Sequence, residues 1–252
     1  MRIVRRSWSI AFRVVSIAAV VALAVAVVLV MRQADAAAPP PRFGDSLQVD
    51  SAPTTPGLAA SAVGAAPTDR IDPAWAARVS ADSGIPVRAL LAYASADVTI
   101  DAEQPDCGLG WNTIAAIGSI ESVHGSIHGS QLGVDGYSVP AIRGPALDGD
   151  GFAAIRDTED GTWDGDTLWD RAVGPMQFIP STWVKWGADG NGDGIADPNQ
   201  IDDAALGTAR YLCASGNVTG VQNWRAAVFS YNHLDSYVDD VASRANRYAA
   251  AG

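Results

Sequence analysis

The residue best placed by type and position to do chemistry is Glu121, in an apolar stretch that runs from residue 112 to residue 125. This stretch reads as a short helix, and at 100° per residue Glu121 falls on one face with Ile114, Ile117 and Gly118. A carboxylate on an apolar face is costly to ionise, so its pKa should rise towards neutrality, which suits a general acid. The alternative is an ordinary glutamate near a frayed helix end.

A second group of residues could hold a neutral polymer beside this acid. The candidates for substrate binding are Ser122, Gln177, Phe178, Tyr231 and Asn232. Amide side chains hold hydroxyl and N-acetyl groups, and aromatic faces stack on the C–H surfaces of sugars. Phe178 and Tyr231 could instead be plain core residues. The combination predicts a cleft for a neutral polysaccharide.

The segment that starts at Asp189 has the donor spacing of a calcium-binding loop. Asp189, Asn191 and Asp193 occupy positions one, three and five, and a glycine follows at position six. Ile195 would offer its backbone carbonyl, whereas position twelve is Gln200, a poorer ligand than the usual glutamate. The alternative is an acidic turn whose glycines supply positive φ angles. We expect a structural calcium ion.

Other metal and nucleophile chemistry has little support in the sequence. His124 and His128 have the i, i+4 spacing of paired ligands, but the glycines at 125 and 129 break the helix and no third ligand follows. There is no Ser-His-Asp order typical of a hydrolase and no glycine-rich phosphate loop. We expect neither zinc nor an organic cofactor.

Composition divides the chain into three parts. Residues 1–31 place four arginines around the start of an 18-residue run that only one serine interrupts. This run predicts a single-pass signal anchor with the following chain extracytoplasmic, although cleavage near residues 34–36 would secrete it instead. Residues 32–70 are rich in Pro, Ala, Ser and Thr and are expected to be a disordered linker. Residues 71–252 should form one domain.

Charge and cysteine content limit the partners. The formal net charge of −11 argues against nucleic acid, because phosphate binding needs a basic surface. The two cysteines are Cys107 and Cys213, which in an exported domain most simply form one disulfide. Two buried free thiols are the alternative.

Helix start and stop signals predict a mainly α domain. Asp72 and Pro73 begin a helix that Gly84 ends, and Asn112 and Gly125 bound the helix of Glu121. Further helices are expected at residues 86–96, 181–186, 202–214, 221–231 and 235–249. Residues 126–171 are rich in Gly and Asp with scattered aromatic residues, which predicts a long irregular flap, ordered and with room for a small hairpin.

The order of these motifs resembles the lytic murein transglycosylases, specifically the membrane-bound B type with a lysozyme-like fold. The resemblance covers residues 72–249 and is strongest over 111–125 and 172–205. It implies that Glu121 is the single catalytic acid/base and that the substrate is peptidoglycan. It also implies that Gln177, Tyr231 and Asn232 line glycan subsites.

The resemblance also bears on the calcium loop and on His124. The family's calcium loop is longer than an EF-hand, and its closing carboxylate then matches Asp203. His124 is a departure, since many relatives have an aromatic residue there, and this affects the cleft wall near Glu121 rather than the acid. We expect a monomer.

The lack of an evident second carboxylate shapes the expected mechanism. Most glycosidases use two carboxylates, but one acid suffices if the substrate's N-acetyl group stabilises the oxocarbenium ion. In the family, Glu121 would then take the proton of the muramoyl C6 hydroxyl and leave a 1,6-anhydro product. Two alternatives stay open: a hydrolytic muramidase that admits water, and a non-catalytic module that binds the cell wall.

Overall fold

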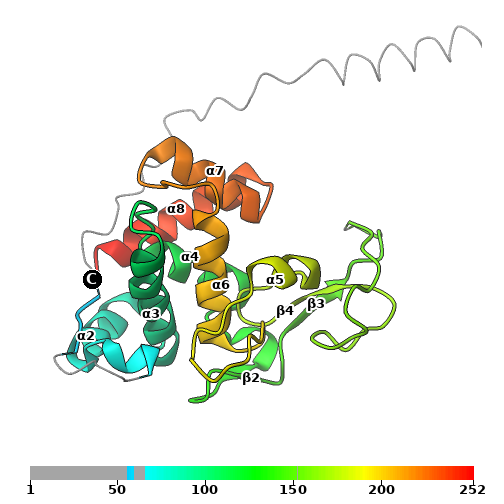
Figure 1. Cartoon of the computed structure of the whole chain (residues 1–252), viewed down its shortest axis with the longest axis horizontal. Helices are drawn as coiled ribbons and strands as arrows, with labels where there is room; N and C mark the ends of the chain where they lie inside the picture. The colour runs from blue at the N-terminus through cyan, green and yellow to red at the C-terminus, as the bar shows by residue number, and fades with distance from the viewer. Residues whose placement is uncertain (1–55, 60–65, 152) are drawn as a thin grey trace, which may run out of the picture. The chain divides into compact units, whose positions relative to one another are not determined.

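The computed structural model describes residues 56–59, 66–151 and 153–252 of the chain (Figure 1). The predicted signal anchor at residues 1–31 lies outside these residues, and so does most of the predicted linker. Among the described residues, no helix is both long and apolar enough to cross a membrane.

The described part is mainly helical, as predicted. Its α-helices are α2 (Pro73–Ser83), α3 (Val87–Glu103), α4 (Trp111–Ser122), α5 (Pro180–Trp186), α6 (Ile201–Cys213), α7 (Val221–Tyr231) and α8 (Asp235–Ala249). Helix α6 packs against α3 on one side and α5 on the other, while α4 packs against α8 (Figure 1). The buried faces of these helices form one apolar core, in which Ile114 and Ile117 of α4 are fully buried.

Two short parts of the predicted linker, residues 56–59 and 66–70, lie among the described residues and make backbone contacts. Leu58 forms an antiparallel bridge with Ile71, and the backbone N–H of Ala59 donates to the carbonyl of Arg70 at 2.8 Å. A 3-10 helix, η1, spans Pro67–Arg70. These contacts use backbone groups, which is why a composition poor in large apolar residues did not reveal them.

Several helix boundaries agree with the sequence signals. The Asp72 carboxylate accepts a hydrogen bond from the N–H of Ala74, and Gly84 adopts the left-handed conformation that ends α2. Helices α7 and α8 have the predicted bounds, and α5 begins one residue earlier than predicted, at Pro180.

Three helix ends differ from prediction, two of them because side chains contact distant segments and one because of a local cap. Helix α3 continues past residue 96, since the Asp97 carboxylate accepts from the backbone N–H of Trp111 at 2.8 Å. Asn112 is not the cap of α4 but lies inside it, where its side-chain amide donates to the carbonyl of Ala245 at 3.1 Å. Helix α6 starts at Ile201, because the Gln200 side chain caps its first turn.

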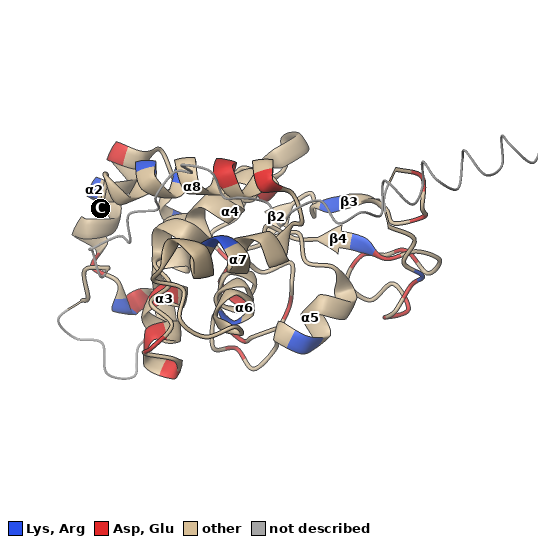
Figure 2. Ribbon diagram, turned by 90° about the horizontal axis from the view of Figure 1, so that it is seen from above, with Lys and Arg blue, Asp and Glu red and all other residues tan. Residues whose placement is uncertain are grey.

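The segment 126–171 is an ordered, irregular flap. It contains the 3-10 helix η2 (Ile127–Gly129) and two small antiparallel sheets, in which β1 (Gln131–Leu132) pairs with β2 (Ser138–Val139), and β3 (Arg143–Ala146) pairs with β4 (Arg171–Val173). Acidic residues follow the loops beyond β3 and β4 (Figure 2). The short strands explain why the sequence shows no alternation.

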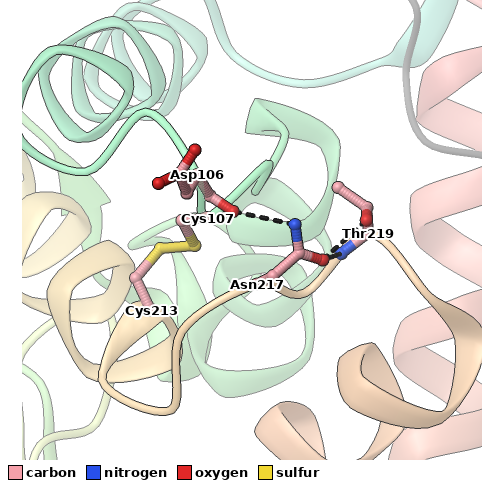
Figure 3. The surroundings of a disulfide bond; sticks show 5 residues. All are labelled: Asp106, Cys107, Cys213, Asn217 and Thr219. Atoms are coloured by element: carbon pink, nitrogen blue, oxygen red, sulfur yellow. Dashed lines mark hydrogen bonds between the residues drawn. A yellow bond between two sulfur atoms is a disulfide. The ribbon is translucent and has the colours of Figure 1, made fainter.

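The predicted disulfide between Cys107 and Cys213 is present (Figure 3). It joins the loop before α4 to the last residue of α6. Beside it, the Asn217 amide donates to the carbonyl of Asp106 at 2.8 Å, and the N–H of Val218 donates to the carbonyl of Cys107 at 2.8 Å. The entry to α4 is thus tied to the loop that leads into α7.

Candidate active site

Glu121 lies in the last turn of α4, with its carboxylate against α8. The Tyr237 hydroxyl donates to Oε1 of Glu121 at 2.6 Å. Burial raises the pKa of Glu121 to about 7, although the hydrogen bond from Tyr237 lowers it. The direction of this pKa is the one expected from the sequence. A group that titrates near neutrality can both give and take a proton. No second carboxylate of the described residues is among the groups that shift this pKa.

The backbone of α4 lies close to its neighbours one turn before Glu121. A Cβ at Gly118 would come within 2.3 Å of the Tyr93 hydroxyl and 3.1 Å of the Met176 sulfur. Glycine therefore lets α3 and the segment around Met176 close on α4. This contact brings the end of the Glu121 helix next to the segment that carries Gln177.

The chain after α4 turns sharply in left-handed conformations. Val123, His124 and Gly125 have φ angles of 53°, 57° and 81°. For a β-branched residue such as Val123 this conformation is strained and persists only where surrounding contacts enforce it. His124 supplies such contacts, as its ring lies 3.1 Å from the Tyr93 hydroxyl and 3.2 Å from that of Tyr248.

His124 is buried and uncharged at neutral pH. Burial lowers its pKa to about 4, and the positive charge of Arg244 adds to this effect. A neutral imidazole has one donor and one acceptor nitrogen, so one tyrosine hydroxyl receives a hydrogen bond and the other gives one. The sequence left open whether this residue forms part of the cleft wall. In the structure its ring is buried between Tyr93 of α3 and Tyr248 of α8.

One face of α8 holds the end of α4. Tyr237, Arg244 and Tyr248 are seven and four residues apart, which places them on a single stripe of the helix. Tyr237 contacts Glu121, Arg244 donates to the Ser119 hydroxyl at 2.6 Å, and Tyr248 contacts the ring of His124. The sequence analysis missed this stripe, since spacing reveals a face but not its partner.

Ser122, which the sequence predicts to bind substrate, lies inside the protein at the end of α4. Its side chain is fully buried. Its hydroxyl donates to the carbonyl of Pro175 at 2.6 Å and accepts from the N–H of Gly125 at 2.8 Å. Ser122 therefore joins the turn after α4 to the segment before Gln177.

A groove with a cavity volume of about 250 Å³ lies beside this segment. Its described lining consists of Gln177, Phe178, Ile179, Thr182, Tyr211, Ser230, Tyr231 and His233. Three of the five predicted substrate-binding residues are thus brought together, and Asn232 lies between two lining residues. This arrangement is open, mostly uncharged and rich in aromatic rings, as a saccharide site requires.

Tyr231 connects the groove to the acid. The negative charge of Glu121 helps to raise the pKa of the Tyr231 hydroxyl, so the two groups are close, although Glu121 is not itself among the described lining residues. The Tyr231 hydroxyl donates to the carbonyl of Met176 at 2.7 Å. The Tyr231 ring packs against Phe178 at a centroid distance of 5.9 Å. Phe178 is 3% exposed, so both the core and the cleft interpretations apply to it.

Gln177 has a strained backbone at the groove. Its φ angle is 51°, and its side-chain amide donates to the carbonyl of Gly174 at 3.0 Å. The amide oxygen stays available as an acceptor for a ligand N–H or hydroxyl. Strain of this kind is found where a site needs a side chain in one place.

The segment 189–203 closes on itself as a loop around carboxylates. The Asp189 carboxylate accepts from the N–H groups of Gly192 and Gly194 at 2.7 and 2.8 Å, and Asp203 accepts from Gly190 at 2.7 Å. Asp203 is buried, and burial together with the charge of Asp189 raises its pKa to about 6. A bound cation would relieve this cost.

The donors of the loop match calcium in kind. The carboxylates of Asp189, Asp193 and Asp203, the Asn191 amide and the Ile195 carbonyl are hard oxygens. However, no group of three or more His, Cys, Asp or Glu side chains within the described ranges is arranged to hold a metal ion. In this structure the loop carboxylates accept backbone N–H groups instead.

The loop also supports the groove. A Cβ at Gly174 would lie 1.9 Å from the carbonyl oxygen of Pro198, so the segment leading to Gln177 rests on the loop backbone. The Arg143 guanidinium of β3 donates to the Asn199 side chain at 2.5 Å. The loop therefore contacts both the flap and the segment that forms one wall of the groove.

The region that carries these residues matches a known protein family. Residues 91–251, from α3 to the end of α8, match the family model described as transglycosylase SLT domain. No curated protein and no solved structure matches the chain.

Proposed function

Because the chain belongs to the transglycosylase SLT domain family, whose members are glycan-cleaving enzymes of the lytic transglycosylase kind acting on peptidoglycan, we propose that Glu121 is its catalytic residue. The observation that carries this proposal is a carboxyl group whose pKa burial raises to about 7, next to a saccharide-sized groove. The bond cleaved is the β-1,4 linkage between N-acetylmuramic acid and N-acetylglucosamine.

A single carboxyl performs both proton transfers. Protonated Glu121 gives its proton to the glycosidic oxygen as the bond to C1 breaks, and the N-acetyl group of the muramoyl residue stabilises the oxocarbenium ion. The carboxylate then takes the proton of the C6 hydroxyl while the C6 oxygen bonds to C1. Glu121 ends protonated as it began, and the products are a 1,6-anhydro end and a free N-acetylglucosamine hydroxyl.

The neighbouring residues position the acid and the glycan. Tyr237 orients Oε1 of Glu121 and stabilises the carboxylate through its hydrogen bond. Gln177, Tyr231 and Asn232 hold the strand, through amide hydrogen bonds and contact with an aromatic ring. Phe178 forms the floor under Tyr231.

A structural calcium ion in the loop completes the proposal. Asp189, Asn191, Asp193, Asp203 and the carbonyl of Ile195 would hold it. The ion would stabilise the segment below Gln177, since Gly174 rests on the loop. The loop, with its closing carboxylate at Asp203, also supports assignment to the membrane-bound B type. An anchor at residues 1–31 would place the enzyme at the outer face of the cell membrane.

The test is release of soluble fragments from purified peptidoglycan. Glu121→Gln keeps the shape and the Tyr237 contact but removes the acid, so release should fall at least about a thousandfold for a group with both proton-transfer roles. Asp240→Asn, an exposed carboxylate elsewhere on α8, is the matched control and should keep full activity. Full activity of Glu121→Gln would refute the role of Glu121, and sedimentation with peptidoglycan without release by the native chain would favour a binding module.

A further inference from the structure

A row of aromatic rings leads from the groove to the end of α5. The ring centroids of Tyr231 and Tyr211 lie 5.5 Å apart, and those of Tyr211 and Trp186 lie 5.9 Å apart, both edge-on. The Tyr211 hydroxyl donates to the carbonyl of Ser230 at 2.6 Å, which fixes this ring between α6 and α7. Tyr211 lines the groove, and the half-buried Trp186 packs against Tyr211 just outside the described lining.

Lys185, the only lysine of the chain, stands at the end of this row. Its ammonium nitrogen lies 4.9 Å from the centre of the Trp186 ring, a cation–π arrangement that holds the side chain against the row. Figure 2 marks the basic residue of α5 in blue. Arg171 and Arg210 pair with carboxylates, whereas Lys185 has no ion-pair partner within the described ranges. It is an exposed cation left unpaired in an acidic chain.

The rest of the groove lacks this charge. Its described lining holds amide, hydroxyl and aromatic groups, with His233 as the only titratable nitrogen. Such a lining suits the uncharged parts of a glycan. Lys185, which contacts the groove residue Tyr211 through the Trp186 ring, could bind an anionic part of the same ligand.

We propose that Lys185, held by Trp186, is a subsite for a carboxylate carried by the glycan strand. The proposed substrate bears such carboxylates on its muramic acid residues, on the lactyl group when it is free and on the attached peptide otherwise. This inference rests on the proposed function for the identity of the ligand. It makes Lys185 a residue that selects for muramic acid strands over glycans without carboxylates.

Binding is measured with the full chain carrying Glu121→Gln, so that no cleavage is needed. The three ligands are peptide-bearing strands, peptide-free strands with the lactyl carboxylate, and N-acetylglucosamine oligomers, which have no carboxylate. The added change Lys185→Gln should weaken binding of carboxylate-bearing strands roughly two- to fivefold, which is the range an exposed ion pair supplies. Lys185→Arg should restore it, and the loss should shrink at high salt.

Arg247→Gln is the matched control, because Arg247 is an exposed cation in the last turn of another helix, α8. It should bind all three ligands as its parent does, and Lys185→Gln should leave the N-acetylglucosamine oligomers unaffected. Dependence on Lys185 with peptide-free strands assigns the lactyl carboxylate, and dependence only with peptide-bearing strands assigns the peptide. Equal binding before and after Lys185→Gln, equal losses with the uncharged oligomer, or no binding of any ligand by the parent would overturn the proposal.

These outcomes separate the two proposals. If the native chain fails to cleave peptidoglycan yet shows Lys185-dependent binding, the catalytic proposal fails and the subsite stands. If it cleaves normally and Lys185→Gln binds every ligand unchanged, the subsite fails and the catalytic proposal stands.

Discussion

The buried carboxyl of Glu121 should cost the protein stability at neutral and alkaline pH. The folded protein holds this proton more tightly than the unfolded chain does, because the pKa rises from 4.5 to about 7. The contribution of this carboxyl to the free energy of unfolding is therefore fully present below pH 4.5, and it is lost as the pH rises through 7. Each pKa unit corresponds to about 1.4 kcal/mol, so the loss reaches about 3 kcal/mol at pH 8.

Glu121→Gln removes this pH dependence while keeping an acceptor for Tyr237. The free energy of unfolding of both proteins is measured by urea titration at pH 4.5 and at pH 8. The value for the variant minus the value for the native chain should be about 3 kcal/mol larger at pH 8 than at pH 4.5. The comparison of differences cancels every other titrating group and any fixed effect of the amide. Asp240→Asn, on the exposed face of α8, should show no such gain.

The same substitution should abolish cleavage, so activity and stability change in opposite directions. A strained or desolvated catalytic group is a known source of this trade-off. If Glu121→Gln and the native chain keep the same stability difference at both pH values, Glu121 is not desolvated and the reasoning about its pKa is wrong.

Three further outcomes follow from the contacts around the site. Tyr237→Phe removes the hydrogen bond that lowers the pKa of Glu121, so the alkaline limb of kcat/KM should move to higher pH as its maximum falls, and an unmoved limb would contradict the assignment. Calcium should raise the Tm of the native chain and leave Asp203→Asn unchanged, whereas a melting curve that chelation does not alter would exclude the ion. Replacing Cys107 and Cys213 by serine should lower the free energy of unfolding by up to about 4–5 kcal/mol for so long a loop, and an unchanged urea midpoint would contradict a structural role for the disulfide.

Local signals predicted the helices well where the chain itself satisfies its backbone. The cap at Asp72 and the stop at Gly84 are contacts within a few residues, so they can be read from sequence. Asn112 has the composition of a cap but is drawn inside α4 by the distant carbonyl of Ala245. The sequence contains the side chain but not the partner that decides its use.

The residues of the site divide in the same way, into those that the sequence can identify and those that depend on distant contacts. Glu121 and Gln177 could be proposed from the sequence because acid chemistry and glycan binding restrict the residue types. Ser122 was predicted to bind substrate because its hydroxyl lies beside the acid in sequence, whereas its buried hydrogen bonds to the Pro175 carbonyl and the Gly125 N–H can be seen only in the structure. Tyr237 could not be found, since its distance to Glu121 depends on how α8 crosses α4.

The measurement that tests the central claim most directly is the mass of the products formed in water enriched in oxygen-18. If Glu121 acts alone and the C6 hydroxyl closes on C1, the muramoyl ends are 1,6-anhydro sugars that lack one water and carry no label. Reducing ends that carry oxygen-18 would show that water attacks C1. That result would make the protein a hydrolase and contradict the proposed second proton transfer.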